Sequence, residues 1–92
     1  MNLKHARHKQ ILEHLHDVYV DKNNKYGDAF ADTVEKYGNV AALTRMYDKF
    51  SRIETMILHE IEDSEESVID SALDLANYLV MFVIELENCN ET

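Results

Sequence analysis

Residues 64–87 read SEESVIDSALDLANYLVMFVIELE, and this stretch decides the fold. Its apolar residues recur at helical spacing in two neighbouring rows, which predicts a helix that is apolar nearly all round. The rows are Ile69, Leu73, Ala76, Val80 and Val83, and Val68, Ala72, Leu75, Leu79, Phe82 and Leu86. Such a helix is buried on more than one side. One side can pack within its own bundle, and we expect the other to pack against a second copy of the chain.

The preceding sequence predicts three more helices, over residues 2–22, over residues 28–37, and from Asn39 to about His59. The inward-facing residues are expected to be Ile11, Leu15, Val18 and Tyr19 in the first helix, Phe30 and Val34 in the second, and Leu43, Met46, Tyr47, Phe50, Ile53 and Ile57 in the third. Gly27 and Gly38 can take the left-handed conformation that ends a helix, and Asp28 and Asn39 can cap the next one. Asp63 resembles the start of a capping box for the last helix.

These elements predict an all-α, four-helix bundle of three long helices and a short one, as a single domain over residues 1–92. The chain has one cysteine, so no internal disulfide can stabilise it. Small domains without disulfides commonly gain stability by oligomerising. We therefore expect the bundle to be completed by homodimerisation.

The charge is distributed unevenly along the chain. Residues 1–52 contain all nine Lys and Arg and seven Asp and Glu, a net of +2, whereas residues 53–92 contain eleven acids and no Lys or Arg, a net of -11. The total of -9 argues against binding of long nucleic acid, which needs a basic surface. No apolar run reaches the ~18 residues of a membrane span, and the beginning of the chain does not resemble a signal peptide. We expect a cytoplasmic protein without a membrane partner.

A narrow polar line separates the apolar rows of the last helix and includes Asp70, Asp74 and Asn77. Carboxylates one turn apart repel each other and need neutralisation when apolar rows flank them. Their hard oxygens suit Mg²⁺. This interpretation makes Asp70, Asp74 and Asp48 candidate metal ligands.

The third helix carries Arg45, Lys49 and Arg52 on one face, with Asp48 beside them. If the third and fourth helices pack antiparallel, these cations lie opposite the carboxylate line. Two interpretations stay open. The pairs form a salt-bridge network between the helices, or the cations clamp a phosphate beside the metal-binding carboxylates.

The motif Lys-Tyr-Gly-Asp/Asn occurs twice, at residues 25–28 and 36–39. Its first role is to separate helices. Aromatic residues at helix junctions can plug the end of a bundle, or they can stack on a base. The second possibility would place Tyr26, Asp28 and Tyr37 at the mouth of a binding groove.

Three stretches carry a resemblance to a known family, namely NKYGDAF (24–30), ALTRMYDKFSRIE (42–54) and ESVIDSALDLANYLVMFVIEL (66–86). Together they resemble the nucleotide modification associated domain, type 1, a small all-α family of phages and bacteria. That family is in turn similar to the MazG-like and dimeric dUTPase-like pyrophosphohydrolases, which bind Mg²⁺ and cleave nucleoside triphosphates. The resemblance implies that Asp74 matches a metal-binding aspartate, that Asn77 neighbours the base or sugar, and that Arg45, Lys49 and Arg52 face the phosphates.

The chain departs from the hydrolases in its carboxylates. Those enzymes carry Glu-x-x-Glu on one helix and Glu-x-x-Asp on the other, whereas here the fourth helix has Asp70-x-x-x-Asp74 and the third has Asp48 and Glu54. This is a smaller ligand set.

Three functions therefore stay open. The first is an enzyme that uses Mg²⁺, with Glu66 activating water. The second is a module that holds a nucleotide without chemistry, such as a phage protein that sequesters a defence signal or an accessory subunit in base modification. The third is a helical dimer that contacts another protein through its acidic half.

Overall fold

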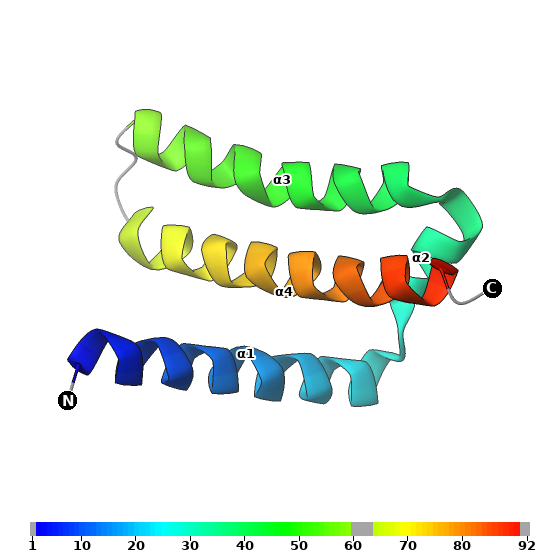
Figure 1. The fold of residues 1–92 in the computed structure, drawn as a ribbon. Helices are drawn as coiled ribbons and strands as arrows, with labels where there is room; N and C mark the ends of the chain where they lie inside the picture. Colours follow the sequence, from blue (N-terminus) through cyan, green and yellow to red (C-terminus); the bar gives the residue numbers. More distant parts are fainter. Residues whose placement is uncertain (1, 60–63, 91–92) are drawn as a thin grey trace.

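The computed structural model describes residues 2–59 and 64–90, leaving aside the side chains of residues 64–67, 89 and 90. This part of the chain consists of four α-helices and contains no strand, which confirms the all-α expectation (Figure 1). The helices are α1 (Leu3–Tyr26), α2 (Ala29–Tyr37), α3 (Asn39–Leu58) and α4 (Ser64–Asn90). None of them combines the length and the apolar character that a membrane crossing requires.

The three long helices lie side by side, with α4 between α1 and α3, and α2 lies at one end of the bundle (Figure 1). Helices α3 and α4 run antiparallel, whereas α1 runs in the same direction as α4. The molecule measures 43 × 37 × 25 Å, so it is flatter along one axis than along the other two. The three long helices form one layer, and both faces of this layer are open (Figure 1). Each long helix therefore has few neighbouring helices.

Glycines end the first two helices in a conformation that differs from the expected one. Gly27 has φ 74° and ψ -169°, and Gly38 has φ 81° and ψ -174°. Positive φ is confirmed, but ψ near 180° is outside the left-handed helical region and is open essentially to glycine alone. Each glycine N–H still closes a last helical turn, to the carbonyl oxygens of Asn23 at 2.9 Å and of Val34 at 2.7 Å.

The predicted cap of α2 is confirmed, because Asp28 Oδ1 accepts the N–H of Ala31 at 3.2 Å. The predicted cap of α3 is wrong, because Asn39 is the first residue of that helix and no side chain caps its start. Helix α1 also continues past Asn23-Asn24 to Tyr26, where a break was expected. The expected cap at Asp63 lies outside the described residues.

The core forms where α2, α3 and α4 meet. Phe30 and Val34 of α2 and Ala42 and Met46 of α3 are buried, and half-buried apolar residues of α4 pack against them. The ring of Phe30 stacks on that of Tyr78, with ring centroids 5.6 Å apart. Helix α1 contributes a single buried side chain among the described residues, that of Leu15. The core therefore holds α2, α3 and α4 together more firmly than it holds α1.

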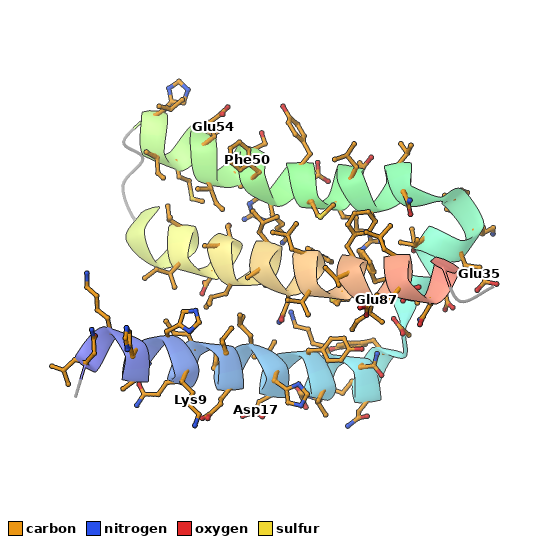
Figure 2. The ribbon with its side chains drawn as sticks, viewed as in Figure 1. Lys9, Asp17, Glu35, Phe50, Glu54 and Glu87 are labelled. Atoms are coloured by element: carbon orange, nitrogen blue, oxygen red, sulfur yellow. The ribbon has the colours of Figure 1, made fainter. Side chains whose placement is uncertain are left out.

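Polar side chains cover the outer edge of α1. Figure 2 shows Lys9 and Asp17 on the side of this helix that points away from α4. The apolar residues expected to face inward lie toward the bundle, because Ile11, Val18 and Tyr19 are half-buried. The inward side expected for this helix is confirmed, although Leu3 and Leu12 are exposed.

The apolar stripe predicted for α3 is only partly buried. Met46 is buried and Ile53 is half-buried, but Leu43, Tyr47, Phe50 and Ile57 are 51–64% exposed. The reason is that α4 packs against the neighbouring row of α3, which contains Ala42. On α4 itself, the outward apolar residues Ile69, Val80 and Val83 are also more than half exposed. We name these seven exposed residues the apolar face.

Candidate functional site

A hollow of about 300 Å³, here the first hollow, opens between α1, α3 and α4 near the junction of α1 and α2. Helix α1 contributes Val18, Tyr19, Lys22, Asn23 and Tyr26 to its lining, and the next residues contribute Gly27, Asp28, Ala29 and Phe30. From the other two helices come Arg45, Lys49, Asp74, Asn77, Tyr78 and Met81. The hollow therefore combines four aromatic rings with three cationic groups.

An ion pair between α3 and α4 lies in this hollow. Lys49 Nζ donates to Asp74 Oδ2 at 3.0 Å, and the two side chains are 22% and 39% exposed. One cation of the α3 row therefore meets one carboxylate of the α4 line, whereas Arg45 and Arg52 form no ion pair among the described side chains and Asp70 is exposed. A partly exposed pair of this kind contributes at most about 1 kcal/mol to stability. The pair matters more for ligand binding, because Lys49 already has an anionic partner in the Asp74 carboxylate.

Asn77 connects the hollow to α1. Its Nδ2 donates to the backbone carbonyl of Leu15 at 3.1 Å. A net contribution of about 1 kcal/mol is typical of such a bond. Asn77 therefore positions α1, and with it the side of the hollow that contains Tyr19, Lys22 and Tyr26.

A wider and more open groove of about 820 Å³, here the second hollow, adjoins the first. Its lining consists of Thr33, Ala41, Thr44, Asp48, Ser51 and Arg52, together with Arg45, Lys49 and Tyr78, which also line the first hollow. The hydroxyls of Thr33 and Thr44 donate to the carbonyls of Ala29 and Val40 on their own helices, at 2.8 and 2.9 Å. The cationic side chains are therefore the main donors in this groove.

Both hollows carry net positive charge on a chain whose total charge is -9. Three cations and two carboxylates line the first hollow, a net of +1, and three cations and one carboxylate line the second, a net of +2. The ion pairs among the described side chains are Lys25–Asp21 and Lys49–Asp74, so neither involves Arg45 or Arg52. A local positive patch on an acidic protein attracts anions to that place.

The structure brings together most of the predicted binding residues. Arg45, Lys49, Asn77, Tyr26 and Asp28 line the first hollow, and Arg52 lines the second. Tyr37 lines neither; it is 67% exposed and its ring lies 5.5 Å from Lys36 Nζ. The two copies of the Tyr-Gly motif therefore differ in position, although their backbone conformations are nearly the same.

The predicted metal ligands are dispersed. Asp74 lies in the first hollow, Asp48 in the second, and Asp70 is exposed and lines neither. The Glu66 side chain lies outside the described part of the chain. Among the residues that the structure describes, no three His, Cys, Asp or Glu side chains cluster as metal ligands. Asp74 is paired with Lys49 and Asp28 caps α2, so the carboxylates of the first hollow fit Mg²⁺ poorly as arranged.

Sequence reasoning identified Tyr26 as a binding residue of α1 but missed Tyr19, Lys22 and Asn23, which line the same hollow. Tyr19, Lys22, Asn23 and Tyr26 follow one another at spacings of three, one and three residues, so they share one side of the helix. That signal was readable in the sequence. The break expected at Asn23-Asn24 concealed it, because it separated Tyr26 from the helix.

Comparison with known proteins adds no assignment to this geometry. No protein-family model, no curated protein and no solved structure matches the chain. The function has to be inferred from the chemistry of the two hollows.

Proposed function

We propose that the chain binds a nucleotide in the first hollow. The observation that carries this proposal is that aromatic rings and cationic groups without a described ion-pair partner line one cavity of about 300 Å³. Ligand sites typically measure ~300–1,000 Å³, so a small ligand such as a mononucleotide suits the lower end of this range. The resemblance of three sequence stretches to a nucleotide-associated family agrees with this ligand class.

The aromatic rings that line the first hollow differ in how much of each is exposed to solvent. Phe30 is buried and stacks on Tyr78, and both rings line the hollow. Tyr26 is 77% exposed at the rim, so its face can stack on a base. Stacking of one base on an aromatic side chain contributes about 1–3 kcal/mol.

The polar groups supply the remaining interactions. Arg45 can hold a phosphate through two parallel N–H donors, and Lys22 adds a second positive charge from α1. The amide of Asn23 can exchange hydrogen bonds with the edge of a base. A nucleotide in this position would contact α1, α3 and α4 at once.

Binding without hydrolysis is the form of this function that we favour. The two carboxylates of the first hollow are already engaged, Asp74 with Lys49 and Asp28 with the start of α2. Cleavage of a phosphoanhydride by the Mg²⁺ route expected from the resemblance would need them to change partners. The enzymatic alternative therefore predicts turnover that depends on Mg²⁺ and on Asp74.

Titration calorimetry with nucleoside mono-, di- and triphosphates tests the proposal, once in chelator and once with Mg²⁺. We expect binding in chelator and intact ligand after incubation, as measured by chromatography. Tyr26→Ala should weaken binding by about 5- to 150-fold, which corresponds to the loss of ~1–3 kcal/mol. Tyr37→Ala is the matched control, since this tyrosine sits in the same motif but lines neither hollow. Equal losses in the two variants, or no nucleotide binding at all, would refute the proposal.

The apolar face is suited to contact with a second copy of the chain. Its seven residues are each more than half exposed and come from α3 and α4. Helical spacing places them on other sides of these helices than Arg45, Lys49, Asp74 and Asn77, so a homodimer through this face leaves the first hollow open. Light scattering should give twice the chain mass, and Val80→Glu should reduce it to the monomer value. A wild-type protein that is monomeric at high concentration contradicts this assembly.

A further inference from the structure

The two hollows adjoin each other, because Arg45, Lys49 and Tyr78 line both of them. A ligand bound beside Arg45 in the first hollow therefore lies next to the second. Each hollow also has one cationic residue that the other lacks. Lys22 lines only the first, and Arg52 lines only the second.

A row of positive charge runs along α3 through both hollows. Arg45, Lys49 and Arg52 occupy positions i, i+4 and i+7, so the row is about 10 Å long at ~1.5 Å per residue. A single phosphate contacts one or two members of such a row, whereas an extended chain of phosphates can contact all three. The length of the row therefore matches a ligand with several linked anionic groups.

The donors of the second hollow also suit phosphate oxygens. Arg52 is exposed and lacks a described ion-pair partner, so its planar group is available for a bidentate contact. Ser51 adds a hydroxyl. Asp48 is the one carboxylate in the lining, and it opposes an anion. Lys49 is already paired with Asp74. The balance is therefore between Arg45 and Arg52 on one side and Asp48 on the other, which still leaves a net attraction for an anion.

We infer that the second hollow receives the distal phosphates of a nucleoside di- or triphosphate whose base, sugar and first phosphate occupy the first hollow. This inference rests on the proposed nucleotide binding and specifies the ligand class. Arg52 is the residue that distinguishes a triphosphate from a monophosphate. The recognition uses side-chain cations and needs no metal ion.

Calorimetry in chelator with the mono- and triphosphate of one nucleoside provides the test. We expect the wild-type protein to bind the triphosphate at least tenfold more tightly. Arg52→Gln should reduce triphosphate affinity about tenfold and leave monophosphate affinity unchanged, because the lost contact is a charge-assisted hydrogen bond. Lys22→Gln should weaken both ligands. Lys36→Gln removes an exposed cation that lines neither hollow, and it should change neither affinity.

A further variant should change triphosphate affinity in the opposite direction to Arg52→Gln. Asp48→Asn removes the carboxylate of the second hollow, so triphosphate affinity should rise while monophosphate affinity stays constant. Both Arg52 and Asp48 are exposed, and circular dichroism melting should confirm that each variant folds.

The possible failures are distinguishable. Equal wild-type affinity for the two ligands, or an Arg52→Gln loss that is the same for both, overturns this inference and leaves nucleotide binding in the first hollow intact. The absence of binding by any nucleotide overturns both proposals.

Discussion

Replacing Asp74 with asparagine should tighten nucleotide binding, contrary to the usual effect of changing a residue inside a binding site. Asp74 holds Lys49 at 3.0 Å, so an incoming phosphate competes with a resident carboxylate for the same ammonium group. Asparagine has nearly the same shape and can still accept a hydrogen bond from Lys49. The substitution therefore removes one negative charge and preserves the packing of α3 against α4.

The expected magnitude follows from the geometry. A phosphate on the far side of Lys49, at a similar distance, would lie about 6 Å from the Asp74 carboxylate. Coulomb repulsion between unit charges at that separation is ~0.7 kcal/mol in bulk water and ~3 kcal/mol at the effective dielectric constant of a protein surface. The two side chains are 22% and 39% exposed, which favours the lower part of this range. A gain of about 1 kcal/mol corresponds to a roughly fivefold lower Kd.

The same substitution has a small cost in stability. Loss of the Lys49–Asp74 ion pair should lower the free energy of unfolding by about 0.2–1 kcal/mol. For a domain of this size, 1 kcal/mol corresponds to roughly 4–8 °C in Tm. Saturating nucleotide should recover more than this loss, because ligand at 100 times its Kd stabilises the folded state by about 2.7 kcal/mol.

Calorimetry on Asp74→Asn with a nucleoside monophosphate, in chelator and then with Mg²⁺, tests whether the substitution tightens binding. We expect a lower Kd in both buffers. If the variant binds more weakly in Mg²⁺ than the wild type does, Asp74 serves as a metal ligand and the competition argument is wrong. If neither buffer shows any change, the phosphate does not approach Lys49.

Three further predictions concern the scaffold. Asn77→Leu should lower stability by about 0.5–1.5 kcal/mol and speed amide exchange in α1 more than in α3, because it removes the bond to Leu15; uniform exchange rates across the helices would contradict this. Phe30→Ala should cost about 3–5 kcal/mol in urea unfolding, and a loss below 1 kcal/mol would show that this ring is not a core residue. Gly38→Ala should cost about 1–3 kcal/mol in thermal unfolding, whereas Asn39→Ala should be nearly neutral; the reverse order would restore Asn39 as the cap.

The number and approximate bounds of the helices were predictable because apolar residues recur at helical spacing in each helix and the chain has two glycines at the junctions. Glycine was identifiable as the terminator, but its exact backbone angles were not, because they depend on how the next helix packs. The continuation of α1 through Asn23-Asn24 was missed. Asparagine disfavours a helix by less than ~1 kcal/mol, and this cost is small beside the packing of a long amphipathic helix.

The site was predictable where it depends on helix periodicity and antiparallel pairing. The contact between Lys49 and Asp74 follows from those two features. The position of Asp70 did not follow, because periodicity gives the side of a helix and not the distance along it. Asp70 lies one turn, about 6 Å, nearer the start of α4, whereas the first hollow forms near the junction of α1 and α2.

The apolar stripe of α3 shows a related difficulty. Tyr47 and Phe50 have the composition of core residues, but which flank of a helix is covered depends on how many neighbours the helix has. A single chain of this size places three long helices in a layer, and the layer leaves one flank of α3 open. The composition of a helix does not show how many other helices will pack against it.

The attachment of α1 has a consequence for regulation. This helix supplies five of the residues that line the first hollow, yet its described anchorage consists of one buried leucine, the half-buried side chains of Ile11, Val18 and Tyr19, and one hydrogen bond from Asn77. Apparent affinity scales with the fraction of molecules in which the binding-competent arrangement is populated, so detachment of α1 in nine molecules out of ten would weaken binding about tenfold. If the chain binds a nucleotide in the first hollow as proposed, any factor that stabilises the docked helix, such as a protein seated on its outer edge, would act as a positive effector without contacting the nucleotide.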